Sequence, residues 1–76
     1  MVGFRFSAKY KADELKIEGF VRNESDGSIY IEAEGSEKNL EKFLEWCKKG
    51  PDFANVRRIE KRAAKVKKYK EFKIKY

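Results

Sequence analysis

Apolar residues recur with a helical period near the start of the chain. Phe4, Ala8, Ala12 and Leu15 follow the spacing of one helix face, whereas the Lys and Asp residues between them fall elsewhere. This pattern predicts a helix over residues 4–15. Because they are large and apolar, we expect two further side chains to extend the buried face of this helix, namely Phe6 and Tyr10.

A second helical pattern follows Ser36, which is a favourable N-cap residue. Its apolar stripe is flanked by outward Lys and Glu residues and consists of Leu40, Phe43, Leu44 and Cys47. Trp46 lies off this stripe, and we expect it to cover the flank of the helix. The Gly50-Pro51 pair predicts the end of the helix. Cys47 lies on the stripe, so it is predicted to pack in the core rather than to act as a nucleophile.

The remaining segments carry the signals of β-strands. Residues 17–22 and 28–34 flank a turn sequence with Asp26-Gly27, which supplies the positive φ of a hairpin. In the second of these strands, alternate residues point to opposite faces. A third strand is predicted from Asn55 to about Ala64, with Val56 facing inward. After a basic loop, a last strand alternates apolar residues with lysines and contains Phe72, Ile74 and Tyr76.

The predicted order is helix, two strands, helix and two strands, within 76 residues. A chain of this length forms one small domain, which we assign to residues 1–76. Two helices on a mainly antiparallel sheet make an α+β fold. The pattern is that of a ferredoxin-like α/β plait that lacks its first strand.

Composition adds two expectations. One cysteine allows no intramolecular disulfide, and no apolar run approaches the roughly 18 residues that span a membrane, so we expect a cytoplasmic protein without membrane contact. The abundance of Lys and Glu is typical of ion-pair-rich surfaces of thermophile proteins.

Charge is unevenly distributed along the chain. Residues 57–76 contain ten Lys or Arg against two Glu, a net +8, so that residues 1–56 carry −2 and the whole chain +6. A basic tail of this kind attracts polyanions, although a solvated strand pair and loop is the simpler interpretation.

Four short blocks, in this order and spacing, resemble one protein family. They are Val2-Gly3-Phe4-Arg5; Gly19-Phe20-Val21-Arg22-Asn23 with Asp26-Gly27; Gly50-Pro51 before a valine-led strand; and the closing run from Phe72 to Tyr76. Together they resemble the acylphosphatases over essentially the whole chain. The resemblance implies an acylphosphatase-like plait and the hydrolysis of acyl phosphates to a carboxylate and phosphate, with no metal and no cofactor.

The resemblance also assigns roles to individual residues. Arg5 matches the arginine that binds the phosphoryl group, and Asn23 matches the asparagine that positions the attacking water. The backbone N–H groups of Val2, Gly3, Phe4 and Arg5 match part of the phosphate-binding loop, so the expected ligands are an acyl phosphate and phosphate or sulfate anions. These assignments agree with the chemistry, because a carboxylate is a good leaving group and the chain has no histidine for acid–base catalysis.

The family pattern starts upstream of the first matching block, as Gly-x-Val-Gln-Gly-Val-Gly-Phe-Arg. Met1 stands where its second glycine would be, so we expect the first strand and most of the phosphate loop to be absent and activity to be weak or lost. That strand lies centrally, between the strands predicted at 28–34 and near 55–64. Its absence predicts a gap in the sheet and a homo-oligomer, with the gap closed by another chain or by rearranged strand pairing.

Two other functions remain open. A non-catalytic, self-assembling remnant shares the fold and differs only in activity. A nucleic-acid-binding plait is suggested by the basic tail and by the aromatic residues Tyr30 and Tyr69, although Glu32 and Glu34 share the face of Tyr30.

Overall fold

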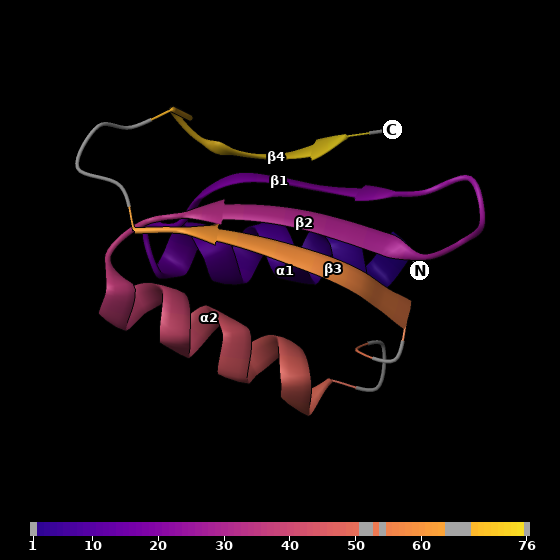
Figure 1. Ribbon diagram of the computed structural model, residues 1–76, viewed down its shortest axis with the longest axis horizontal. Coiled ribbons are helices and arrows are strands. Elements are labelled where there is room, and N and C mark those ends of the chain that lie inside the picture. Colours follow the sequence, from indigo (N-terminus) through magenta and orange to yellow (C-terminus); the bar gives the residue numbers. More distant parts are fainter. Residues whose placement is uncertain (1, 51–52, 54, 64–67, 76) are drawn as a thin grey trace.

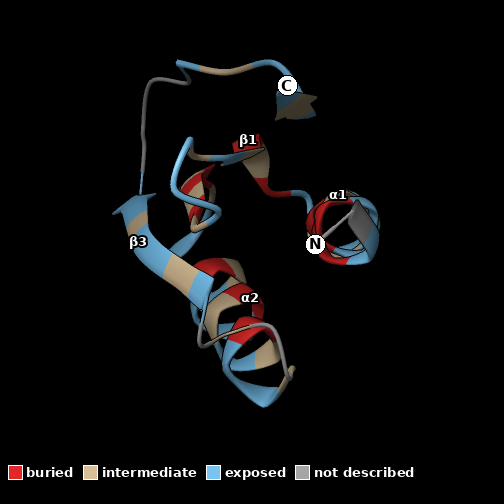
Figure 2. Ribbon diagram, turned by 90° about the vertical axis from the view of Figure 1, so that its right-hand side faces the viewer, coloured by how far each residue is buried: buried red, intermediate tan, exposed pale blue. Residues whose placement is uncertain are grey.

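The computed structural model describes residues 2–50, 53, 55–63 and 68–75. Its elements follow the predicted order, α1 (Val2–Glu14), β1 (Glu18–Asn23), β2 (Ile29–Glu34), α2 (Glu37–Lys49), β3 (Val56–Arg62) and β4 (Phe72–Lys75). Both helices lie on one face of a four-stranded sheet, as Figures 1 and 2 show, which makes a two-layer α+β sandwich. Tyr76, Ala64 and the basic loop predicted near 64–67 lie outside the described residues.

The strand order in the sheet is β3-β2-β1-β4. β1 and β2 form the predicted antiparallel hairpin, whereas β1 pairs with β4 and β2 pairs with β3 in parallel. The expectation of a mainly antiparallel sheet is therefore wrong. The physical reason is that the α2 crossover returns the chain in the direction of β2, so β3 pairs in parallel when it lies directly beside β2.

The predicted gap in the sheet is wrong as well. β2 and β3 are hydrogen-bonded neighbours from Ile29↔Val56 to Glu34↔Arg62, which is the rearranged strand pairing that was one of the two expected remedies. Unpaired backbone groups are costly when they are buried, so closing the sheet directly satisfies the donors and acceptors of the inner strands.

The core lies between the sheet and the helices, whose buried positions face it (Figure 2). Phe4, Ala8 and Ala12 of α1 are buried as predicted, whereas Phe6 and Tyr10 are 56% and 76% exposed. The prediction for these two residues is wrong because they lie two and six positions after Phe4, on the opposite side of a helix with about 3.6 residues per turn.

The second helix follows its sequence pattern closely. Ser36 caps it by accepting a hydrogen bond from the Asn39 N–H at 3.2 Å, and Leu40, Phe43 and Cys47 are buried. Trp46 stacks on the rings of Phe4 at 5.8 Å and Phe43 at 6.0 Å between centroids. The expected cover of the helix flank is thus the aromatic contact that joins α2 to α1.

A tight connection turns α1 directly into β1. The Ile17 N–H donates to the Ala12 carbonyl at 2.8 Å and the Lys16 N–H to that of Asp13 at 3.2 Å, which is the Schellman pattern of a helix end. Lys16 occupies the left-handed region with a φ of 57°. The strand therefore runs back along the helix that precedes it.

We predict that Gly19→Ala strongly destabilises the fold. Gly19 has a φ of 138°, and an added Cβ would lie 2.0 Å from the backbone oxygen of Glu32 on the paired strand. Backbone strain and overpacking together are expected to lower the free energy of unfolding by about 2–5 kcal/mol, measured by urea denaturation. Gly3→Ala is the matched control, because its Cβ meets nothing within 4 Å and alanine favours a helix by up to about 1 kcal/mol. Equal midpoints for the two variants would contradict the prediction.

We also predict that the thiol of Cys47 is unreactive in the folded protein. The side chain is fully buried, and burial raises the pKa of the thiol from its usual 9.0 to about 12, because the thiolate loses its hydration. At pH 8 the thiolate population is therefore lowered roughly a thousandfold, and labelling by a thiol reagent should follow unfolding. Complete labelling within seconds in native buffer, as fast as in denaturant, would disprove it.

Candidate active site

Arg5 lies in the first turn of α1. That turn consists of the four residues assigned to phosphate binding, because the helix begins at Val2. The first four N–H groups of a helix have no acceptor within it and form the positive end of its dipole. Arg5 is only 8% exposed, so its permanent positive charge is largely shielded from solvent in the same turn as these groups.

Asn23 is the last residue of β1 and is exposed. Alternation along the strand places it on the same face as Val21, which is buried toward the helices, and opposite Phe20 and Arg22. Its cross-strand neighbour is Ile29, the first residue of β2, so this pair closes the hairpin loop. Asn23 thus lies on the helix-covered side of the sheet, where this side reaches solvent.

Arg5 and Asn23 are brought to the same end of the molecule. α1 has 13 residues and β1 has six, so both are about 20 Å long, and the tight turn between them reverses the chain direction. The N-terminus of α1 and the C-terminal end of β1 consequently lie at one end, on the right in Figure 1. The two residues predicted from the sequence therefore share one end and one side of the sheet.

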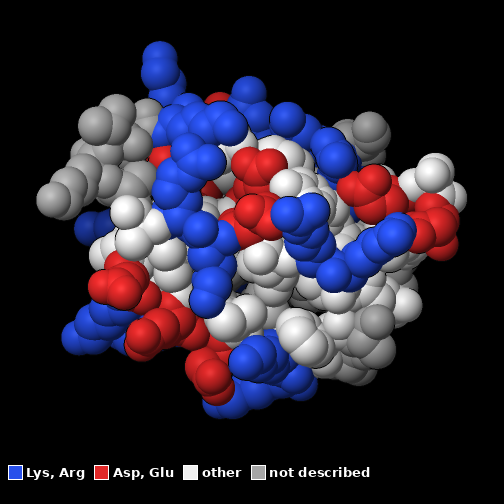
Figure 3. Space-filling model, in the orientation of Figure 1, with Lys and Arg blue, Asp and Glu red and all other residues white. Residues whose placement is uncertain are grey.

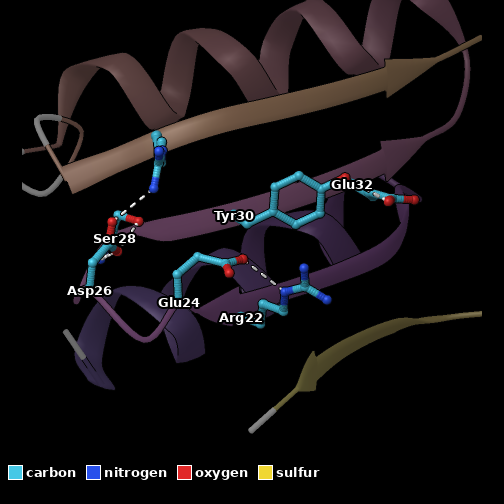
Figure 4. A network of polar contacts seen from close by, with 7 residues as sticks. Arg22, Glu24, Asp26, Ser28, Tyr30 and Glu32 are labelled. Carbon is cyan, nitrogen blue, oxygen red and sulfur yellow. Dashed lines mark hydrogen bonds and ion pairs between the residues drawn. The ribbon is translucent and has the colours of Figure 1, made fainter.

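The loop that follows Asn23 is held by Asp26 (Figure 4). One carboxylate oxygen accepts the Ser28 N–H at 2.9 Å and the Ser28 hydroxyl at 2.6 Å, and the other accepts Arg57 Nη1 at 2.8 Å. The hydroxyl and N–H of Ser28 hold the pKa of the Asp26 carboxyl below its usual value, with a smaller contribution from Arg57. Gly27 supplies the positive φ, 88°, that the turn sequence predicted.

Sequence reasoning did not identify Arg57 as part of this region. The pairing of β2 with β3 shifts by one residue after Ile29, so that Arg57 has no cross-strand partner and Arg58 pairs with Tyr30. Such an irregularity redirects a side chain, and here it accompanies the contact of Arg57 with Asp26. No sequence signal marks this contact, because it joins residues 31 positions apart and depends on the one-residue shift in the pairing of β2 with β3.

The open face of the sheet does not favour the nucleic-acid interpretation. The hydroxyls of Tyr30 and Tyr69 both donate to the Glu32 carboxylate, the first at 2.7 Å. These bonds lower the pKa of Glu32, and the same carboxylate raises the pKa of Tyr69 to about 12. Both rings also pack against Phe20, with centroids 5.8 and 6.0 Å apart, so they are engaged within the protein. Basic and acidic side chains are intermixed in the view of Figure 3.

Among the described residues, no group of three His, Cys, Asp or Glu side chains is placed to hold a metal ion. Neither described helix combines the length and the apolarity needed to cross a membrane.

Comparison with known proteins gives one consistent result. The family model described as "Acylphosphatase" matches residues 1–74. The acylphosphatase of Archaeoglobus fulgidus is 44% identical over 75 residues, covering 99% of this chain and 84% of that protein. The acylphosphatase of Oceanobacillus iheyensis is 46% identical over 77 residues, with 99% and 85% covered.

Structural comparison identifies the same family as the sequence comparison. The crystal structure of acylphosphatase from Bacillus subtilis superimposes with a TM-score of 0.76 at 34% identity, covering 99% of this chain and 84% of that one. The match of a family model to nearly every residue, together with this structural similarity, shows that the chain belongs to the acylphosphatase family of hydrolases.

Proposed function

We propose that this chain hydrolyses acyl phosphates, with Arg5 binding the phosphoryl group and Asn23 positioning the attacking water. The N–H groups of the first turn of α1, from Val2 to Arg5, add hydrogen bonds to the phosphoryl oxygens. The family implies an acyl phosphate as the substrate. The buried thiol of Cys47 suits a reducing compartment, so we place this activity in the cytoplasm.

The observation that carries the proposal is the charge at the start of α1. Acidic residues normally stabilise a helix N-terminus, and α2 follows this rule with Glu37 in its first turn and Lys48 and Lys49 in its last. The first turn of α1 contains no acidic residue and contains Arg5 instead. A cation at the positive end of a helix dipole is electrostatically unfavourable, and a bound anion relieves this repulsion. Binding of the phosphoryl group at that end of α1 accounts for this unfavourable position of Arg5.

The guanidinium and the N–H groups suit the reaction as well as the anion. Negative charge on the transferring phosphoryl group is spread over its equatorial oxygens, which a planar guanidinium contacts in a bidentate manner. Because the carboxylate leaves readily, catalysis depends on positioning and charge stabilisation rather than on a strong general acid. The absence of histidine from the sequence is compatible with this chemistry.

Asn23 is suited to hold the water. A primary amide offers a carbonyl oxygen that accepts from the water, while its NH₂ group donates elsewhere. The residue is exposed at the end of β1, where water has direct access. The loop behind it is fixed by the contacts of Asp26 with Ser28 and Arg57, so the strand end that carries the amide is held in place.

We predict that Arg5→Gln and Asn23→Ala each lower kcat/KM for a simple acyl phosphate by about 10²-fold or more, because each removes a group that stabilises or orients the transition state. Inorganic phosphate, used as a competitive inhibitor, separates the two roles. Arg5→Gln should weaken phosphate binding, whereas Asn23→Ala should leave it nearly unchanged. Steady-state kinetics at neutral pH gives both quantities.

Two controls accompany this experiment. Arg22→Gln removes a guanidinium next to Asn23 in sequence that instead lies against the ring of Tyr30 on the open face, and it should retain activity. Arg5→Lys keeps the charge but loses the planar fork, so its partial activity would separate electrostatics from folding. Turnover that survives both site substitutions would refute the assignment of the site. A folded wild-type chain without any turnover would instead identify a non-catalytic family member.

A further inference from the structure

A basic hollow lies on the open face of the sheet, where β1 pairs with β4. It has a volume of about 320 Å³, and its charged lining consists of Lys68, Lys70, Lys73 and Lys75 with Glu71, a net +3. Lys73 and Lys75 alternate with the buried Phe72 along β4, so they point away from the helix layer. Lys and Arg side chains gather along the upper edge of the molecule in Figure 3, where Figure 1 places β4.

Ion pairs compensate only part of this charge. Lys73 Nζ lies 3.8 Å from a carboxylate oxygen of Glu71, near the limit of an ion pair. In the part of the chain that the structure describes, the ammonium groups of Lys68, Lys70 and Lys75 form no ion pair. All three residues are exposed, so their charges are available to an anion from solution.

The ring of Phe20 lies between two cations at the edge of this hollow. Lys75 Nζ is 4.1 Å from the centroid of the ring, and the guanidinium carbon of Arg22 is 5.6 Å from it. The two cationic residues are also neighbours in the parallel pairing of β1 with β4. Arg22 forms an ion pair with Glu24 at 2.9 Å. Like charges on neighbouring strands destabilise a sheet, so an anion bound at Lys75 relieves a repulsion.

Two acidic residues of β2 hold the segment that enters β4. Glu34 is buried, and its carboxylate accepts the N–H of Lys68 at 2.6 and 2.9 Å and that of Tyr69 at 2.9 Å. The hydroxyls of Tyr69 and Tyr30 lower the pKa of Glu32, with a smaller contribution from the charge of Lys68. Glu32 thus offsets part of one lysine charge. The backbone of the hollow is fixed before a ligand arrives, so less conformational freedom is lost on binding.

The spacing of the lysines favours a ligand with several linked anionic groups. Lys73 and Lys75 are two positions apart on one face of β4, so their Cα atoms lie about 6.6 Å apart. Lys68 and Lys70 approach from the segment before the strand. Lysine binds phosphate as a point charge, and a chain of phosphates offers an anionic oxygen to each ammonium group along the hollow.

The aromatic rings beside the hollow do not suit the stacking of a base. Phe20 and Tyr69 pack edge to face with centroids 6.0 Å apart, and Lys75 covers the ring of Phe20. Charge is therefore the property that selects the ligand. We propose that the hollow binds a triphosphate chain, whether as inorganic triphosphate or as part of a nucleoside triphosphate, and that the base contributes nothing.

This site is separate from the proposed active site. The hollow is on the open face of the sheet, and its lining contains neither Arg5 nor Asn23, which lie at one end of the helix-covered side. Binding of triphosphate is therefore independent of the hydrolysis of acyl phosphates, and either can fail without the other.

Isothermal titration calorimetry with inorganic triphosphate tests the proposal, without divalent cations and at an ionic strength of about 0.1 M, where the Debye length is about 10 Å. The double variant Lys73→Gln/Lys75→Gln is expected to weaken binding about tenfold or more, because it removes two of the four ammonium groups. Lys38→Gln/Lys42→Gln is the matched control. It removes the same charge from exposed positions on α2 and should bind as the wild type does. Circular dichroism verifies that both variants are folded.

A second comparison separates the hollow from the proposed active site. Arg5→Gln should bind triphosphate as the wild type does. Lys73→Gln/Lys75→Gln should instead keep the hydrolysis of a simple acyl phosphate and its inhibition by inorganic phosphate. Loss of triphosphate binding in Arg5→Gln, with normal binding in the lysine variant, would place the ligand at α1 and overturn the proposal. Because calorimetry needs no turnover, the result holds even for a non-catalytic chain.

Two further ligands distinguish the sources of the phosphate chain. Adenosine triphosphate should bind with the affinity of inorganic triphosphate, since the base adds nothing. Binding of adenosine triphosphate about tenfold tighter overturns recognition by charge alone. A single-stranded RNA oligonucleotide that binds more tightly than triphosphate, and depends on the same lysines, would assign the hollow to nucleic acid instead. Absence of triphosphate binding by the wild type up to about 1 mM, or equal weakening in the α2 control, also overturns the proposal.

Discussion

The direct pairing of β2 with β3 is the contact on which the rest of this structure depends. It joins the hairpin to the strand that follows α2, and it makes residues 29–62 a parallel strand–helix–strand unit. Its irregularity at Arg57 brings that guanidinium to Asp26, which holds the loop after Asn23. A backbone irregularity between the edge strand β3 and its neighbour β2 is thereby linked to the end of β1, where the proposed water-binding amide lies. The strands are paired for stability, and the position of Asn23 follows from that pairing.

The charged residues at their ends distinguish the two helices. α2 is capped and charged as a stable helix should be, with Ser36 at its start and lysines at its end. α1 carries Arg5 where an acidic residue would be favourable, and its C-terminal turn places Lys16 in a left-handed conformation. Such departures from local preference cost stability, and they gather in the element that belongs to the proposed site. Packing offsets this cost, because Phe4, Ala8 and Ala12 are almost fully buried.

The sequence predicts local structure well and strand neighbours poorly. Both helices, the Asp26-Gly27 hairpin and the Ser36 cap depend on residues within a few positions of one another, and all of them were predicted. The place of β3 in the sheet depends on a contact between residues about 30 positions apart, and periodicity carries no information about it. The exposure of Phe6 and Tyr10 has another cause. Their apolar character suggested burial, whereas their angle on the helix decides that they face away from the core.

The side chains of the candidate site are predictable from the sequence, whereas the contacts that support its loop are not. Arg5 and Asn23 were named from motif blocks, and chain geometry brings them to one end because a 13-residue helix and a six-residue strand have equal lengths. The ion pair of Asp26 with Arg57 was not predictable from the sequence, because it depends on the one-residue shift in the pairing of β2 with β3. A site built from groups on α1 and β1 is thus encoded locally, while the support of its loop is encoded by the topology. Substitutions in β3 that restore a regular register are therefore expected to alter the position of Asn23, although the substituted residues do not contact it.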